Sequence, residues 1–152
     1  MHTTLRFFGD TSDAQRDALT ALVAELGKDT SGWSVRATAV HGFPDPSRAH
    51  VLVLDVVDDV VDGRAGAPPT LPGLAARAEA TAVALGFARE LRPYHGHLTL
   101  ARMRKVVDVS SFAAEAASLP TGLVTAITLY ASRSGPSGAV YAPLARAVLP
   151  AP

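Results

Sequence analysis

Apolar residues follow two different periods along the chain, and the change of period marks the expected elements. Residues 3–8 are β-branched and aromatic, and residues 33–40 alternate between apolar and polar, so both are expected to be strands. Residues 50–57 are almost continuously apolar, which is typical of a strand covered on both faces. Between the first two strands, apolar residues recur at helical spacing over 13–26. This part of the chain therefore predicts a strand, a helix and two further strands.

The predicted helix over 13–26 has recognisable signals at both ends. Ser12 and Gln15 stand three positions apart, as in a capping box, in which each side chain binds a free N–H of the first turn. Gly27 is the expected stop at the C-terminal end. A second helix, rich in alanine, is expected over 74–86.

The second half of the chain repeats the element order of the first. A strand over 97–103 is followed by a helix over 109–118, which Asp108 caps, and by strands near 123–131 and 139–148. Because this order matches that of the first half, we expect two similar β-α-β lobes packed together.

Glycine and proline mark one clear linker, over 62–73. A length of 152 residues fits a single domain. We therefore expect one domain over 1–152, with a first lobe at about 1–61 and a second lobe at about 74–152. Apolar residues make up 48% of the chain and charged residues 18%, which predicts a folded domain with a substantial core rather than a disordered chain.

Two copies of a His-x-Thr-Leu motif are the strongest candidates for chemistry: His2-Thr3-Thr4-Leu5 and His97-Leu98-Thr99-Leu100. Chance predicts roughly 0.04 such matches, so two copies are unexpected unless they have a function. Each motif lies at the start of a predicted strand, where residues two positions apart face the same side. If the lobes are related by an approximate two-fold axis, two imidazoles and two hydroxyls meet across one cleft.

This set of side chains suits transfer of a phosphoryl group. Histidine titrates near neutral pH, so one imidazole can take a proton from water while the other gives a proton to the leaving oxygen. The threonine hydroxyls can hydrogen-bond the non-bridging phosphate oxygens, where charge accumulates in the transition state. Such a reaction needs neither a metal ion nor an organic cofactor, and we expect none.

Charge and composition limit the other classes of function. The formal net charge is zero, so the totals give no sign of a surface built for long nucleic acid. The chain has no cysteine, which excludes disulfides, cysteine-ligated zinc and thiol catalysis. No leader peptide opens the sequence and no apolar run is long enough to span a membrane, so we expect a cytoplasmic protein without membrane association.

The two motifs in their context, HTTLRFFG and HLTLARMR, resemble those of the 2H phosphoesterase superfamily. The resemblance is strongest to the bacterial RNA 2′,3′-cyclic phosphodiesterases, also called 2′-5′ RNA ligase-like proteins. GFPDPSRAHVLVLDV over 42–56 resembles the middle of that group, and LYASRSGPSGAVYAPLARAVL over 129–149 resembles its closing hairpin. The resemblance implies an α+β fold with two pseudo-symmetric β-α-β lobes, whose antiparallel sheets face a central cleft. It also implies hydrolysis of 2′,3′-cyclic phosphates at RNA ends or on nucleotides, which leaves a 2′-phosphate.

By motif position, the resemblance implies a catalytic set made of His2, Thr4, His97 and Thr99. His2 is assigned as the acid toward the 3′-oxygen and His97 as the base toward water, and the pseudo-symmetry of the lobes leaves the reverse assignment open. Thr4 and Thr99 are assigned as phosphate-binding residues. Arg102 matches an arginine that contacts phosphate, although a solvated strand residue is the alternative. Phe7 matches an aromatic residue that stacks on a base, although a place in the core is equally expected.

The sequence departs from the family pattern in two places. Members of the group normally carry a strand and a helix before the first motif, whereas Met1 precedes His2 directly here. If those elements are missing, apolar surface and a sheet edge are left open, so we expect low stability or self-association. Gly96 stands where the group usually has proline, and it should loosen the approach to His97 without changing the face of its side chain.

The remaining histidines are weaker candidates. His95 stands two residues before His97 and is expected at the rim of the cleft or in solvent. A metal site formed by these two residues and His2 is disfavoured, because no carboxylate stands beside them in the sequence. His41 and His50 flank a proline-rich turn and are expected to be structural or exposed, and Asp55 is interpreted as part of a solvated strand end.

Other functions fit the same motifs. A 2H enzyme of different specificity would act on ADP-ribose cyclic phosphate or on 2′-5′ linked RNA. A different class is a non-catalytic module that binds nucleotides or RNA ends. Only turnover separates the enzymes from the binding module.

Overall fold

The structure is a computed structural model that describes residues 1–28, 30–59, 70–112, 121–135 and 138–151. Its helices and strands, with one short 3-10 helix η1, are α1 (Asp13–Lys28), β1 (Trp33–Phe43), η1 (Pro46–Arg48), β2 (Ala49–Asp58), α2 (Leu71–Ala84), β3 (His97–Val107), β4 (Thr121–Val124), β5 (Ala126–Gly135) and β6 (Gly138–Val148).

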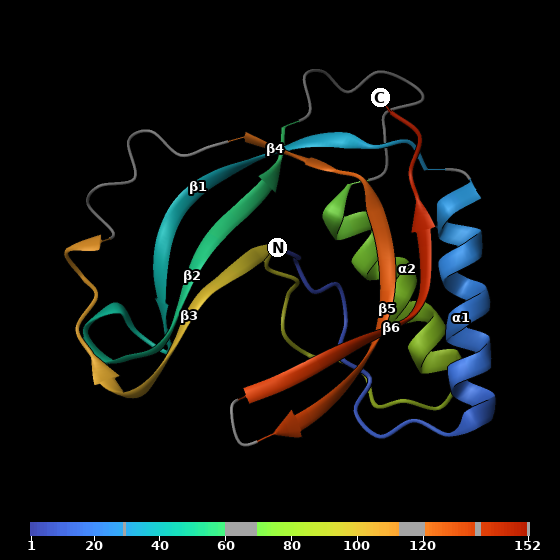
Figure 1. Cartoon of the computed structure of the whole chain (residues 1–152), viewed down its shortest axis with the longest axis horizontal. Coiled ribbons are helices and arrows are strands. Elements are labelled where there is room, and N and C mark those ends of the chain that lie inside the picture. Colours follow the sequence, from blue (N-terminus) through green and yellow to red (C-terminus); the bar gives the residue numbers. More distant parts are fainter. Residues whose placement is uncertain (29, 60–69, 113–120, 136–137, 152) are drawn as a thin grey trace.

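Two antiparallel sheets organise the described residues. One sheet has the strand order β3-β2-β1-β4, and the other pairs β5 with β6. The larger sheet curls on one side of the molecule, helices α1 and α2 lie on the other side with β5 and β6, and the N-terminus lies between them (Figure 1). The expected α+β class with antiparallel sheets is confirmed. The division into lobes over 1–61 and 74–152 stays a prediction, although strands from both halves of the chain share the larger sheet.

Helix α1 begins as expected and ends later than expected. Ser12 N–H donates to Gln15 Oε1 over 3.0 Å and Gln15 N–H donates to Ser12 Oγ over 3.3 Å, which confirms the capping box. Gly27 lies inside the helix, so its assignment as the stop was wrong. A Cβ atom on Gly27 would clash with Cβ of Ala147, so a glycine is needed here for close packing of α1 on β6.

Two predicted strands are different in the structure. Over 3–8, only Thr3 forms a β bridge, and the rest of this segment is irregular. The strand expected near 123–131 is two strands, because β4 belongs to the larger sheet and β5 to the smaller one. The chain changes sheets at Thr125, which lies between them, and its carbonyl accepts a hydrogen bond from the Leu149 N–H over 2.9 Å.

Helix α2 begins inside the segment expected to be a linker. Thr70 caps it through a hydrogen bond from the Gly73 N–H to its hydroxyl, over 3.2 Å. The Leu71 N–H donates to the carboxylate of Asp58, which also accepts from the indole N–H of Trp33 over 2.7 Å. Asp58 therefore ties the end of β2 to the start of α2 and to β1. Residues 60–69 lie outside the described residues, as do residues 113–118 of the helix expected over 109–118.

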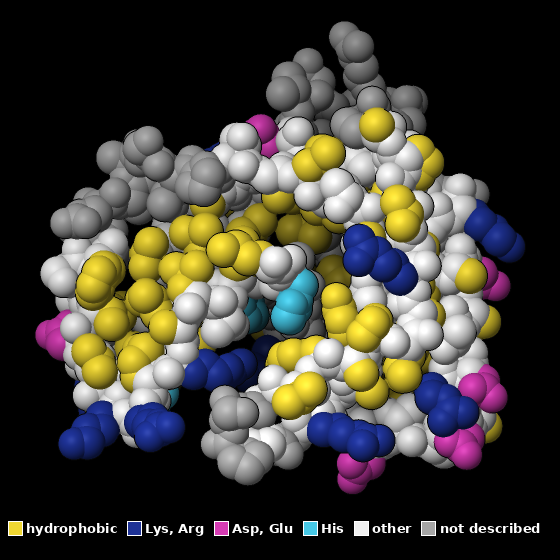
Figure 2. All heavy atoms as spheres, viewed as in Figure 1, with side chains coloured by type: hydrophobic (Ala, Val, Ile, Leu, Met, Phe, Trp, Pro, Cys, Tyr) yellow, Lys and Arg dark blue, Asp and Glu magenta, His cyan; other side chains and the backbone are white. Residues whose placement is uncertain are grey.

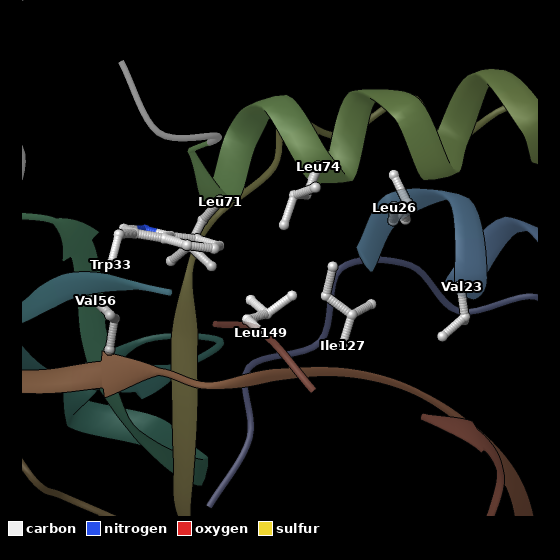
Figure 3. Close-up of a cluster of buried hydrophobic side chains, with 8 residues drawn as sticks. All are labelled: Val23, Leu26, Trp33, Val56, Leu71, Leu74, Ile127 and Leu149. Atoms are coloured by element: carbon white, nitrogen blue, oxygen red, sulfur yellow. The ribbon is translucent and has the colours of Figure 1, made fainter. Parts of the chain in front are cut away.

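One apolar cluster joins both helices to both sheets. It contains Val23, Leu26, Trp33, Val56, Leu71, Leu74, Ile127 and Leu149 (Figure 3). These residues come from both helices, from β1, β2 and β5, and from the segment after β6. The two sheets therefore share one core, which fixes the position of the motifs that lie between them. Within the described ranges, no helix has the length and apolar character needed to span a membrane.

Candidate active site

The two His-x-Thr-Leu motifs lie side by side. Thr3 forms an antiparallel β bridge with Leu98, and these residues are the second position of each motif. The His97 N–H also donates a hydrogen bond to Thr3 Oγ1 over 3.3 Å. The N-terminal motif is therefore docked directly on the first residues of β3.

The antiparallel bridge brings the two motifs next to each other. The residues that flank it are His2 and Thr4 in the first motif and His97 and Thr99 in the second, so all four are close in space. On β3, side chains two positions apart share a face, which places His97 and Thr99 on the same side of that strand.

A backbone carbonyl holds the imidazole of His97. Its Nδ1 lies 2.9 Å from the carbonyl oxygen of His95. Because a carbonyl oxygen can only accept, Nδ1 carries the hydrogen and Nε2 is the free nitrogen of the neutral ring. The ring of Phe43 packs edge-on against this imidazole at a centroid distance of 6.0 Å. His97 is half-buried, so its orientation is restricted on several sides.

His2 is held from the other sheet. Its ring centroid lies 5.8 Å from that of Tyr130 on β5 and 5.5 Å from that of Tyr141 on β6. Both tyrosines are partly exposed, and their rings contact each other at 6.1 Å. The sequence interpretation missed both residues, although they belong to the closing hairpin whose resemblance to the family it used. We call His2 and Thr4 the first half-site, and His97 and Thr99 the second half-site. The first half-site thus depends on the β5–β6 hairpin as well as on β3.

A β bulge brings Arg102 to the face of the motif. Val53 pairs with Thr99, but Leu52 pairs with Ala101, so Leu100 is an extra residue in β3. Val51, Val53 and Asp55 share one face of β2, and their partners on β3 are Arg102, Thr99 and His97. Strict alternation would have placed Arg102 on the opposite face from His97. The bulge therefore places this exposed arginine beside the motif.

Phe7 lies at the surface and not in the core. Its exposed fraction is 64%, which removes the alternative that it is a core residue. The preceding Arg6 fixes the segment, since its guanidinium pairs with Glu79 and donates to the carbonyl of Ala88 over 2.6 Å. The exposed ring of Phe7 therefore follows directly after Arg6, whose side chain is held in place by Glu79 and Ala88.

A cavity of about 1070 Å³ lies beside the first motif, and its lining includes His2, Thr4, Phe7, Tyr130 and Tyr141 together with many core leucines and valines. Figure 2 shows the molecule hollowed in this region, with hydrophobic side chains around the opening and a histidine at its edge. His97, Thr99 and Arg102 are outside the cavity lining. The bridge therefore joins the two motifs, but the second motif contributes only its leucines, Leu98 and Leu100, to the lining of this cavity.

A carboxylate lies beside the second motif, contrary to the sequence interpretation. Asp55 Oδ1 is 2.9 Å from Nε2 of His95, and Asp55 is also the cross-strand partner of His97. Asp55 is therefore not a solvated strand end, since its side chain is only 17% exposed. Pairing across β2 and β3 is not visible in sequence spacing. In the part of the chain that the structure describes, no group of three or more His, Asp or Glu side chains is arranged to hold a metal ion.

Gly96 tightens the approach to His97 instead of loosening it. Its carbonyl accepts a hydrogen bond from the Val56 N–H over 2.8 Å. A Cβ atom at this position would lie 2.5 Å from the carbonyl oxygen of Val56, so no other residue fits without movement of the backbone. The expectation of a loose approach was wrong.

Tyr94 packs behind the bridge. Its hydroxyl lies 3.5 Å from Thr3 Oγ1. Burial raises the pKa of the Tyr94 phenol, while the hydrogen bond from Thr3 acts in the opposite direction. The phenol is therefore protonated at neutral pH and remains able to hydrogen-bond Thr3.

The chain is similar in sequence to an RNA 2′,3′-cyclic phosphodiesterase of Bacillus subtilis (strain 168). The two are 30% identical over 101 residues, which are 66% of this chain and 50% of the relative. The match thus spans half the length of that curated relative. No family model matches the chain.

Solved structures share the fold. TT0787 of Thermus thermophilus matches with a TM-score of 0.70 and 22% identity, over 99% of this chain and 78% of that protein. E. coli LigT in complex with 3′-AMP matches with a TM-score of 0.61 and 26% identity, over 97% of this chain and 76% of LigT. Almost the whole chain therefore has a structural counterpart, while about a quarter of each neighbour has none here.

Proposed function

Because this chain belongs to the 2H phosphoesterase superfamily, we propose that it hydrolyses 2′,3′-cyclic phosphates at RNA ends or on nucleotides to 2′-phosphates. The observation that carries the proposal is the Thr3–Leu98 bridge, which brings the two motifs side by side. The name of the B. subtilis relative and the nucleotide bound to LigT support this class of substrate.

In the proposed reaction the two histidines have different tasks. Nε2 of neutral His97 takes a proton from water as the water oxygen attacks phosphorus. The bond between phosphorus and the 3′-oxygen breaks, and protonated His2 gives its proton to that oxygen. The product keeps the phosphate on the 2′-oxygen. Each proton transfer contributes about 10²–10⁴-fold to the rate.

The bond from His97 Nδ1 to the carbonyl of His95 suits the role of a base. It leaves Nε2 unprotonated in the neutral ring, and it persists after Nε2 has accepted a proton. The hydroxyls of Thr4 and Thr99 bind the non-bridging oxygens, where negative charge increases in the transition state. No step in this scheme uses a metal ion.

Two further residues have proposed roles in binding. Arg102 contacts the phosphate from the face that it shares with His97 and Thr99. Phe7, with its ring exposed beside the cavity, stacks on a nucleobase.

The test is hydrolysis of 2′,3′-cyclic AMP by the whole chain in excess EDTA. We expect turnover to 2′-AMP with a bell-shaped pH profile, and a loss of at least about 10³-fold in kcat for His97→Ala and His2→Ala. His50→Ala, an exposed residue of β2, is the matched control and should keep full activity. A chain that binds the nucleotide without turning it over is a binding module. Turnover that EDTA abolishes would contradict the metal-independent scheme.

We also propose that the chain associates with itself through apolar surface. Leu100, Leu123 and Leu144 line the cavity and are 43%, 50% and 46% exposed. Exposed apolar patches of this kind favour association. Light scattering over a range of concentrations checks this, and a monomer that unfolds cooperatively at every concentration would contradict it. Residence in the cytoplasm stays a prediction.

A further inference from the structure

The pair formed by Asp55 and His95 lies next to His97 and has no task in the proposed reaction. Asp55 Oδ1 and His95 Nε2 are 2.9 Å apart. The carboxylate is only 17% exposed, whereas the imidazole of His95 is 54% exposed. A carboxylate is thus held largely out of solvent to bind a surface histidine.

Asp55 pairs with His95 and not with His97, its direct cross-strand neighbour. Asp55 and His97 are cross-strand partners in the β2–β3 register. Opposed residues of an antiparallel pair have side chains on one face and close together. The carboxylate nevertheless pairs with His95, two residues before His97, and the imidazole of His97 binds the His95 carbonyl instead.

Two contacts with β2 hold the segment around His95. Its side chain is tied to β2 through Asp55, and the carbonyl of the following Gly96 accepts from the Val56 N–H over 2.8 Å. The ring of Phe43 contacts the imidazoles of both His95 and His97, at 6.3 and 6.0 Å. These contacts hold in place the one carbonyl oxygen that orients His97.

We propose that Asp55 and His95 are positioning residues for His97, which set its tautomer and its ring orientation through the His95 carbonyl. This inference rests on the proposed function for its kinetic consequence. The tautomer of His97 depends on the partner of Nδ1. When the carbonyl moves, both neutral tautomers are populated, and the fraction with a free Nε2 in the correct place falls.

Kinetics of three variants test the inference. Asp55→Asn, His95→Gln and the double variant should each lower kcat about ten- to hundredfold, since small misplacements of a catalytic group have effects of this size. KM should stay within about twofold, because the proposed reaction gives neither residue a contact with the substrate. The double variant should be no worse than the more damaging single one. Asp59→Asn is the matched control, since the Asp59 carboxylate pairs with Arg36 at 3.8 Å at the surface, on the same strand end but away from His95.

The ring nitrogens of His97 provide a readout that does not require turnover. Long-range ¹H–¹⁵N spectra of the whole chain should show Nδ1–H as the dominant neutral tautomer of His97. In Asp55→Asn and His95→Gln the two tautomers should be mixed, with an unchanged unfolding midpoint, because a partly exposed pair contributes little to stability. His95→Gln keeps the test available if Asp55→Asn does not fold.

The outcomes separate this inference from the proposed function. If His97→Ala keeps full activity, the proposed function fails, while the tautomer spectra still decide the positioning role. If His97→Ala is inactive but both single variants keep wild-type kcat and a single tautomer, the positioning role alone is overturned. Additive losses in the double variant would also overturn it, because they would mean that Asp55 and His95 act separately.

Discussion

The two His-x-Thr-Leu motifs share a pattern but are supported in different ways. The second motif belongs to β3, where β2 pairs with its residues His97, Leu98 and Thr99 along a continuous register. The first motif is held by one bridge at Thr3, by the hydrogen bonds of the Thr3 hydroxyl with the His97 N–H and with Tyr94, and by the aromatic contacts of His2. The comparison shows that a motif defines the available chemistry, whereas its neighbours in space define how firmly the groups are placed.

The supports of the two half-sites come from different sheets. His97 depends on β2, through Asp55 and Val56, whereas His2 depends on Tyr130 and Tyr141 of the hairpin. A disturbance of β2 should therefore damage the second half-site first. A disturbance at Thr3 should damage both, because this residue joins them.

Gly96→Ala should produce the largest effect, since it damages the firmer half-site. The new Cβ would lie 2.5 Å from the Val56 carbonyl oxygen, so the backbone between His95 and His97 must move. We expect a loss of about 10²-fold in kcat/KM and a destabilisation of about 2–3 kcal/mol. Urea unfolding and hydrolysis of 2′,3′-cyclic AMP measure the two effects.

Gly122→Ala is the matched control for this substitution. Its Cβ would lie 3.6 Å from Val35 Cγ2, an ordinary van der Waals distance, at an exposed position of β4. Its activity and unfolding midpoint should equal those of the wild type. Equal behaviour of the two alanine variants would mean that the close approach of Gly96 to β2 has no role.

Thr3→Val should have the next largest effect, because Thr3 connects the two half-sites through its bridge to Leu98 and its hydrogen bond with His97. Valine has nearly the same shape, but it leaves the half-buried His97 N–H without its acceptor. An unpaired buried donor costs about 1–3 kcal/mol, and we expect kcat to fall about tenfold as the first residue of β3 loosens. Thr3→Ser keeps the hydroxyl acceptor and should retain most of the stability and most of kcat. A serine variant as impaired as the valine variant would contradict this explanation.

The sequence was sufficient to predict the superfamily and several local elements, because the motifs and the start of α1 are short-range patterns. The capping box at Ser12, the apolar face of α1 and the face shared by His97 and Thr99 all follow from residue spacing. The contact of Asp55 with His95 does not, because it depends on a register between strands forty residues apart in sequence. The place of Arg102 was also hidden, since an extra residue in β3 reverses the alternation that sequence reasoning assumes.

Arg102→Gln tests whether the bulge gives the second half-site an additional phosphate contact. The substitution removes a charge from the face of His97 and Thr99, so we expect kcat/KM to fall about tenfold, as for loss of a charged hydrogen bond of about 1.5 kcal/mol. Arg77→Gln removes a charge from the exposed side of α2 and is the control. An equal loss in both variants would indicate a general effect of net charge and not a contact.

Tyr94→Phe should have the smallest effect, because it removes only the contact of the Tyr94 hydroxyl with Thr3. The hydroxyl of Tyr94 is 3.5 Å from Thr3 Oγ1, at the outer limit of a hydrogen bond, so its loss should cost less than about 1 kcal/mol near neutral pH.

The pH dependence of stability is the more informative test of Tyr94. Since burial raises the pKa of the phenol in the folded protein, ionisation favours the unfolded chain. The stabilisation is therefore complete below the ordinary tyrosine pKa of about 10 and is lost as pH rises through the raised value. Urea unfolding at neutral and alkaline pH should show the wild type losing stability relative to Tyr94→Phe, and parallel curves would mean that the phenol behind the bridge is not shielded from water.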